Sequence, residues 1–389
     1  MASVTQTISP ALRRARVSVF ALFVVFGLAV STWAVHIPSI QQQTGISTAM
    51  LGTMLLVLGA GALVGMQVTG PLITRFGGGT TGVVAGAAMS ILLVGPMLAT
   101  DKTELLVGLT LFGLAMGGTD VSMNAQAVVV EQDYERSIMS AFHAVFSVGS
   151  VIGSLIGAAT LALEWSMTTT AVVMSGTCLL LTLAAATHLV RFSRPTRPVD
   201  GAGSTPVRTR TVQRRLVVLG ALAFLLFLSE GAAMDWGSIH AQEHLGASEA
   251  VGALTFGAFV TTMTVGRFSA DRVAQRRGGQ WVVRVGCAVA CVGMGIVLLS
   301  PVVPLTMVGW AIFGLGLSGS VPQVLSTAGN LDGTSGTDFS RVVGLGYGAL
   351  LAGPALIGWL AEHVPINTAM LIPLCATAIC CAAARNVGR

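Results

Sequence analysis

Charge is scarce in this sequence of 389 residues. Only 10% of the residues are charged, and Lys102 is the single lysine, whereas a soluble chain of average composition carries roughly 25% charge. This scarcity excludes an ordinary soluble domain. The pI is near 9.2, but the basic residues sit in short segments between apolar runs. We therefore do not interpret the basic balance as a nucleic-acid footprint, and we expect no nucleic-acid partner.

The signatures of common catalytic and metal sites are also missing. The sequence contains no HExxH, no GxSxG elbow and no phosphate-binding glycine loop with lysine, which argues against enzymes of those kinds. The six cysteines lie inside apolar runs and lack the spacing of a structural zinc site. We expect them to be small buried apolar side chains. We expect no cofactor, no metal and no enzymatic activity.

Apolar residues and glycine are abundant, at 53% and 48 residues. Runs of about 20 apolar residues are long enough to span a membrane as helices. The first run has full spanning length and no small-residue cleavage site, so we interpret it as a membrane helix and not as a signal peptide. The predicted spans are 16–38, 48–72, 81–99, 105–129, 138–161, 168–190, 216–239, 249–269, 281–300, 302–326, 341–361 and 367–384.

The basic residues predict the orientation of these twelve spans. Twenty of the 21 Lys and Arg fall at the termini and in the even-numbered connections, and Lys102 alone falls in an odd-numbered one. This is the positive-inside pattern, which reflects the cost of moving Arg across lipid. We predict a multi-pass protein of a bacterial inner membrane with both termini in the cytoplasm.

Three separated places in the chain repeat at an offset of 201 residues. The offset relates Gly45-Ile46-Ser47 to Gly246-Ala247-Ser248, and Phe112-Gly113-Leu114 to Phe313-Gly314-Leu315; the third place pairs Phe146 and Gly157 with Tyr347 and Gly358. Each half holds six spans, which predicts a parallel repeat about an axis along the membrane normal. We predict an all-α membrane protein of two pseudo-symmetric six-helix bundles, 1–190 and 216–389, joined by a cytoplasmic linker, 191–215. Part of this Arg-rich linker can lie on anionic membrane lipid.

Three acidic residues lie within predicted spans: Asp120, Glu230 and Asp235. We expect no basic residue deep in any span to neutralise them, and isolated carboxylates at membrane depth are costly. One interpretation is that Asp120 or Glu230 takes up and releases a proton during transport, with Asp235 near the outer mouth. The alternative is a protonated carboxyl group that joins two helices by hydrogen bonds.

Polar residues also form stripes on two helices. Gly113, Gly117, Asp120 and Asn124 share one face of the fourth span. In the fifth span a stripe of His143, Ser147, Ser150 and Ser154 runs beside a small-residue face of Gly149, Gly153 and Gly157. We predict that the glycines pack against a neighbour and that the stripe faces inward. His143 then contacts substrate or a proton, or it bonds to the serines of its own bundle.

Tryptophan stands beside an ionisable residue at the outer end of both the first and the seventh span. Trp33 precedes His36, and Asp235 precedes Trp236, with His240 beyond it. These tryptophans are interfacial anchors or part of a gate. The predicted substrate cavity lies between the halves and is lined by Trp33, Asp120, Asn124, His143, Glu230, Trp236, Gln323 and Tyr347, and we predict that His36 also contacts the substrate. The offset of 201 residues pairs Asp120 with the apolar Val321. The predicted site is therefore asymmetric within a symmetric scaffold, and such a site is suited to binding one particular ligand.

Two loops resemble the loop signature of the major facilitator superfamily. Gly266-Arg-Phe-Ser-Ala-Asp271-Arg272 follows the eighth span, and Gly70-Pro-Leu-Ile-Thr-Arg75-Phe-Gly77 follows the second. The resemblance implies the major facilitator fold and a cytoplasmic gate formed by Gly266, Asp271 and Arg272, as a charge-assisted latch. The first copy carries Thr74 where an acidic residue is expected, so we expect its latch to be weaker.

A narrower resemblance covers nearly the whole chain. Runs such as Trp33-Ala-Val-His36-Ile-Pro38 and Glu230-Gly-Ala-Ala-Met-Asp235-Trp236 are similar to the bacterial YbjJ-type branch, near the fucose-permease group. This implies a monomeric, proton-coupled secondary transporter that moves a small solute by alternating access. Because no deep Arg or Lys is expected, a neutral polyol or sugar, or an amphipathic or cationic compound, fits better than an anion. Proton-driven export of a drug or metabolite is the alternative, and a channel or non-transporting sensor is a more distant one.

Overall fold

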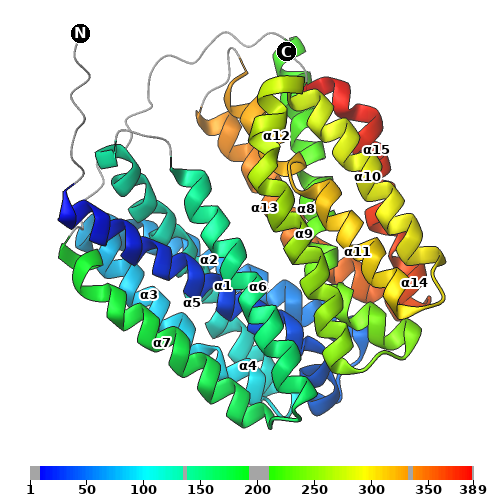
Figure 1. The fold of residues 1–389 in the computed structure, drawn as a ribbon, viewed down its shortest axis with the longest axis horizontal. Coiled ribbons are helices and arrows are strands. Elements are labelled where there is room, and N and C mark those ends of the chain that lie inside the picture. The colour runs from blue at the N-terminus through cyan, green and yellow to red at the C-terminus, as the bar shows by residue number, and fades with distance from the viewer. Residues whose placement is uncertain (1–8, 135–137, 192–209, 332–335, 388–389) are drawn as a thin grey trace. The chain divides into compact units, whose positions relative to one another are not determined.

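The computed structural model describes residues 9–134, 138–191, 210–331 and 336–387, and within these ranges the regular structure is helical (Figure 1). The helices are α1 (Pro10–Thr44), α2 (Thr48–Phe76), α3 (Gly78–Leu92), α4 (Val94–Leu98), α5 (Lys102–Tyr134), α6 (Met139–Ala162), α7 (Met167–Arg191), α8 (Arg210–Leu245), α9 (Glu249–Arg277), α10 (Gly279–Leu299), α11 (Val303–Leu317), α12 (Ser320–Gly329), α13 (Gly336–Ala361), α14 (Ile366–Ala369), α15 (Leu371–Ala383) and the 3₁₀ helix η1 (Ala384–Val387).

The predicted spans coincide with these helices. Eleven helical segments of the described residues are long and apolar enough to cross a membrane. The remaining predicted span, 341–361, lies within α13, whose apolar part is Ala352–Ala361. Three spans are each divided between two helices: α3 with α4, α11 with α12, and α14 with α15. The predicted fold class, an all-α multi-pass membrane protein, is confirmed.

Four glycines with positive φ occupy equivalent places in the two halves. Gly45 and Gly246, each with φ +63°, follow α1 and α8, and Gly77 (φ +83°) and Gly278 (φ +87°) separate the next two helices in each half. Each pair is 201 residues apart. Only glycine adopts this region of φ at no steric cost. The repeat seen in the sequence is therefore also a repeat of backbone conformation.

The described chain clusters into two compact units, which differ from the predicted halves. Unit 1 comprises Met1–Trp33, Ala60–Gly153 and Trp165–Pro198, and unit 2 comprises Ala34–Gly59, Ser154–Glu164 and Val199–Arg389. Unit 2 thus includes one end of α1, α2 and α6 in addition to the helices after residue 199.

Glycines carry the close helix contacts of unit 1. A Cβ atom at Gly65 would lie 2.1 Å from the carbonyl oxygen of Leu114, so α2 and α5 are in close contact at this glycine. A Cβ at Gly149 would lie 2.6 Å from the carbonyl oxygen of Val24, so α6 and α1 are in close contact there. Small residues allow membrane helices to approach at backbone distance. The predicted packing role of the glycine face of the fifth span is confirmed.

Unit 2 is packed in the same way. A Cβ at Gly314 in α11 would lie 2.3 Å from the carbonyl oxygen of Phe259 in α9, and one at Gly293 in α10 would lie 2.4 Å from the backbone of Phe313. The spans that carry α7, α10 and α15 are the most exposed, since 39% of each apolar window is buried, against 67% for α1.

Candidate functional site

The polar part of unit 1 centres on a pair within α5. Asn124 Nδ2 donates to the carboxylate of Asp120 at 3.1 Å and to the Asp120 carbonyl oxygen at 2.9 Å. Both residues are half-buried. Gly117, one turn earlier on the same face, lies against α2, because a Cβ there would be 1.9 Å from the Ala62 carbonyl oxygen. The predicted stripe thus has a packing part and a polar part, and the Asn124 amide orients the carboxylate within one helix.

The His/Ser stripe of α6 is also partly self-satisfied. Ser147 and Ser150 are buried, and their hydroxyls donate to the carbonyl oxygens of His143 and Phe146 at 3.1 and 3.2 Å. The imidazole of His143 is exposed, and its ring lies edge-on to Phe23 at 5.5 Å. The serine hydroxyl donors are therefore used inside α6, whereas His143 keeps an accessible ring.

Glu230 of unit 2 forms an ion pair inside the membrane-spanning region. Arg267 Nη2 of α9 lies 2.8 Å from Glu230 Oε1 of α8, and the two side chains are 27% and 14% exposed. Arg267 lies ten residues before the end of α9, which is about 15 Å along the helix axis. The pair joins two antiparallel helices by a charge-assisted hydrogen bond.

This pair corrects one expectation drawn from the sequence. The sequence places Arg267 at the cytoplasmic end of its span and leaves Glu230 without a basic partner; the second of these predictions is wrong, because the two side chains form an ion pair. The candidate span that contains Arg267 ends at Ala270, and the Arg267 side chain still reaches the Glu230 carboxylate of the neighbouring helix. One of the three carboxylates in the spans is therefore neutralised, whereas Asp235, half-buried in α8, has no ion-pair or hydrogen-bond partner within the described residues.

The tryptophans and histidines predicted at a mouth are buried. Trp33 is 3% exposed and Trp236 is fully buried, and neither indole N–H has a hydrogen-bond partner among the described residues. His36 is buried beside Gly157 of α6. His240 Nε2 lies 3.0 Å from Asn367 Oδ1, and its ring is edge-on to Trp310. These side chains are packed within the described structure, and their role in a substrate site stays a prediction.

The remaining predicted residues are only partly described. The amide oxygen of Gln323 lies against the first turn of α10, 2.9 Å from where a Cβ of Gly279 would be. The side chains of Tyr347 and Asp271 lie outside the described part of the structure. Trp33, Asp120, Asn124 and His143 belong to unit 1 and the other predicted lining residues to unit 2. The cavity that combines them stays a prediction.

The predicted gate has one clear structural element. Gly266 of α9 is buried, and a Cβ there would lie 2.2 Å from Ser318 Oγ, at the break between α11 and α12. Arg272 is exposed. In the first copy of the motif the Thr74 hydroxyl donates to the Gly70 carbonyl oxygen of its own helix at 3.2 Å. The latch role of Asp271 and Arg272 stays a prediction.

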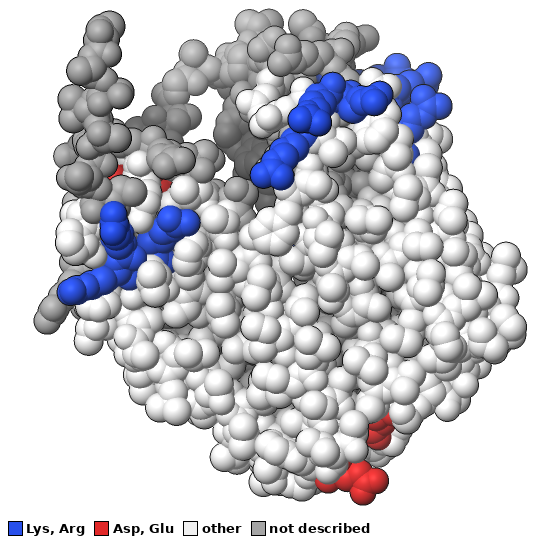
Figure 2. Space-filling view, viewed as in Figure 1, with Lys and Arg blue, Asp and Glu red and all other residues white. Residues whose placement is uncertain are grey.

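Charge is separated along the helices of unit 2. Arg276 and Arg277 end α9, and Arg215 Nε of α8 donates to the Asn386 carbonyl oxygen at 3.2 Å, so these termini gather at one end, the basic end. The opposite, acidic end carries Glu243, Glu249 and Glu362. In the part of Figure 2 occupied by unit 2, Lys and Arg lie at one end and acidic residues at the other.

Three contacts hold the acidic end together within unit 2. The Ser39 hydroxyl bonds to the Glu249 carboxylate, the Ala49 N–H donates to Glu362 at 3.0 Å, and the Trp359 indole N–H donates to Thr53 at 3.0 Å. Gly52 and Gly358 allow α2 and α13 to touch, since a Cβ at Gly358 would be 2.8 Å from the Gly52 Cα. The ends of α1 and α2 are thereby fastened to α9 and α13.

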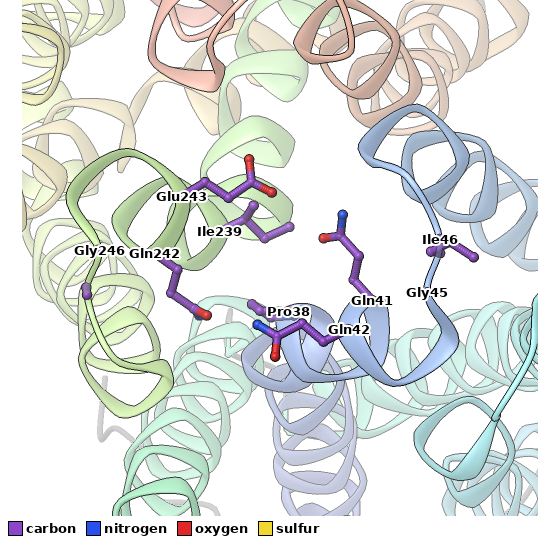
Figure 3. A pocket seen from close by; sticks show the side chains of 10 residues that line it. Pro38, Gln41, Gln42, Gly45, Ile46, Ile239, Gln242, Glu243 and Gly246 are labelled. Atoms are coloured by element: carbon purple, nitrogen blue, oxygen red, sulfur yellow. The ribbon is translucent and has the colours of Figure 1, made fainter.

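A pocket of about 540 Å³ opens at the acidic end (Figure 3). We call it the end pocket. It is lined by Pro38, Gln41, Gln42, Gly45, Ile46, Ile239, Gln242, Glu243, Gly246 and Ala247. These ten residues form five pairs related by the offset of 201 residues. The repeat could have revealed the pocket, because polar residues recur at this offset after both Pro38 and Ile239.

Known proteins resemble the chain over nearly its whole length. Residues 19–342 match the family model described as Major Facilitator Superfamily. An uncharacterized transporter of that type from Yersinia pestis is 30% identical over 365 residues, 94% of this chain and 93% of that protein. Among solved structures, a bacterial homologue of the human lysosomal transporter Spinster, inward-facing and unoccupied, matches with a TM-score of 0.71 and 16% identity over 98% of each chain. FucP in the outward conformation matches with a TM-score of 0.65 and 15% identity over 96% of this chain and 98% of FucP.

Proposed function

Because this chain belongs to the major facilitator superfamily, a family of membrane transporters and not of enzymes, we propose that it is a proton-coupled secondary transporter of a small solute. In this proposal it works as a monomer by alternating access and needs no cofactor. The YbjJ-type branch near the fucose-permease group, suggested by the sequence runs, is part of the proposal.

The Glu230–Arg267 pair carries the proton-coupling part of the proposal. An arginine holds its charge at any physiological pH, so the pair changes net charge only when Glu230 binds a proton. Protonation removes the negative charge that strengthens the 2.8 Å bond between α8 and α9. A proton on Glu230 is thereby linked to the contact between two helices, which is what coupling requires. Asp120 and Asp235, which lack a described basic partner, are the alternative proton carriers.

The charge of the buried polar groups favours a neutral or cationic solute. Arg267 is offset by Glu230, and the only bond that the structure describes for the Asp120 carboxylate comes from the neutral amide of Asn124. Among the described residues of the proposed cavity, no Lys or Arg is therefore left for an anionic substrate. A polyol, a sugar or an amine satisfies these acceptors with its donors. This replaces the argument from the sequence, which rested on the absence of any deep arginine.

We propose a bacterial inner membrane as the location, with both termini and the basic end of unit 2 in the cytoplasm. The positive-inside pattern supports this orientation. The acidic end then faces outward. Thr103 near the start of α5 and Gln275 in α9 are both exposed, so cysteines at these positions report the orientation. A membrane-impermeant maleimide should label Thr103→Cys in intact cells and Gln275→Cys only after permeabilisation; the reverse pattern would overturn the assignment.

Counterflow in proteoliposomes tests transport itself. Solutes that raise the melting temperature of the purified protein are selected first, since a ligand stabilises the state that it binds. Labelled solute outside should then enter vesicles that are loaded with unlabelled solute. Vesicles that show no exchange for any stabilising solute, although the protein is folded, would favour the non-transporting sensor. If the solute exchanges in counterflow, and a pH gradient then drives it out of the vesicles and not into them, the protein is an exporter.

A further inference from the structure

We propose that the end pocket is a second solute site, which binds an organic cation rich in hydrogen-bond donors, such as an amine-bearing polyol. The proposal rests on the proposed function in one respect, that the solute held there is on its way to or from transport. The pocket volume of about 540 Å³ lies within the range of roughly 300–1,000 Å³ that is usual for small-molecule sites.

The polar groups of the pocket are acceptors more than donors. The Gln41 amide N–H is held by the Thr48 hydroxyl at 3.4 Å, and that of Gln242 by the Ser238 hydroxyl at 3.3 Å. Each bond uses one of the two N–H donors of its amide, so Gln41 and Gln242 each offer a ligand an oxygen that accepts and one remaining N–H. Glu243 adds a carboxylate, which only accepts. A ligand with several N–H or O–H donors matches this set.

Net charge selects among such ligands. Glu243 is the only charged residue of the lining, and it forms no ion pair with a described Lys or Arg. A protonated amine has donors and no acceptor, and its bond to a carboxylate is about twice as strong as a bond between neutral groups. An anion would meet the carboxylate without compensation. The pocket therefore favours a cation over a neutral solute of the same shape.

The repeat explains how the pocket orients its ligand. The two walls come from equivalent residues of α1 and α8, and their polar side chains extend into the same space in Figure 3. Gln41 matches Gln242, whereas Gln42 matches Glu243. Each wall therefore offers an amide oxygen, whereas only the α8 wall carries a negative charge. A ligand places its ammonium group toward the α8 wall and its remaining donors toward either glutamine.

Cysteine protection in the full-length purified protein tests the site. Ile46 lines the pocket, so a maleimide labels Ile46→Cys, and the unsubstituted chain gives the background from native cysteines. The probes are glucamine, an amino polyol, and sorbitol, which has a hydroxyl in place of the amine. Glucamine should slow labelling at concentrations at which sorbitol does not. Equal effects of the two probes, or no effect of either, would overturn the proposal.

Substitutions at Glu243 sharpen the test. Glu243→Gln should raise the half-protecting concentration of glucamine about tenfold, as expected for one lost charge-assisted bond. Exchanging the charge across the walls, Gln42→Glu with Glu243→Gln, should restore most of the protection. Glu164→Gln removes an exposed carboxylate outside the pocket and should change nothing. Unchanged protection in Glu243→Gln would refute the charge argument.

The outcomes separate this inference from the proposed function. If glucamine fails to protect Ile46→Cys while a screened solute still exchanges in counterflow, the second site is wrong and transport stands. If protection follows Glu243 while no solute exchanges, the site stands and transport is wrong. Melting temperatures of all variants confirm that each protein is folded before labelling.

Discussion

The ion pair between Glu230 and Arg267 gives the most quantitative prediction. Replacing Arg267 with Gln leaves a carboxylate that is only 14% exposed without its partner at 2.8 Å. Breaking a fully buried pair costs about 3–5 kcal/mol. Because Arg267 is 27% exposed, water compensates part of this, and we expect a loss of about 2–3 kcal/mol of stability.

The assay is thermal unfolding of the purified protein in detergent. For a chain of this size the loss corresponds to a fall in melting temperature of roughly 3–6 °C, because the shift per kcal/mol shrinks as chains lengthen. Glu230→Gln should show a fall of similar size. The double variant should be no less stable than either single variant, since each single change has already broken the same bond.

The control and the refuting result are both specific. Arg276→Gln removes an exposed arginine at the end of the same helix and should shift the melting temperature by no more than about 1 °C, as surface substitutions do. Additive effects of the two single changes would show that the residues do not interact. A change in Arg267→Gln no larger than in Arg276→Gln would show that the pair contributes nothing.

Three further predictions concern the binding stripe, the packing glycines and the gate. Asn124→Ala should lower substrate affinity with little fall in melting temperature, because the described bonds of the amide stay within α5, to Asp120; a large fall with normal affinity would remove the stripe from the site. Gly149→Val should prevent stable folding, since even a Cβ there would lie 2.6 Å from a backbone carbonyl oxygen of α1, whereas Gly176→Val, in open space on α7, should be tolerated; stable protein in both would contradict the packing. Asp271→Asn should speed labelling of cysteines in the inner cavity from the cytoplasm by releasing the latch, and unchanged labelling of a folded variant would show that no latch exists.

The elements and the repeat could be predicted from the sequence because both depend on local chemistry. A run of apolar residues long enough to span lipid has to hide its backbone groups, which makes it a helix. The turns after α1 and α8 need a residue with positive φ, and glycine stands at the equivalent position in both, as Gly45 and Gly246. The small-residue face around Gly149 signalled a close helix contact for the same reason.

The site could be predicted less well because it depends on how helices rotate and how far they extend. Arg267 is a partner of Glu230 because the two side chains meet between α8 and α9, which a hydropathy window does not show. Trp236 is buried although interfacial tryptophans are usually exposed to headgroups. The end pocket needed two corners that are 201 residues apart to face one space, and hydrophobic periodicity carries no information on that distance.

Proton-driven accumulation tests the central claim most directly. Proteoliposomes with an acidic exterior and an alkaline interior are given a labelled solute that stabilises the purified protein, and the final ratio of internal to external solute is measured. The proposal predicts accumulation against the solute gradient for the wild type and exchange without accumulation for Glu230→Gln, with Glu164→Gln, an exposed control, behaving as the wild type. Accumulation that ignores the pH gradient, or that persists in Glu230→Gln, would contradict proton coupling through the Glu230–Arg267 pair.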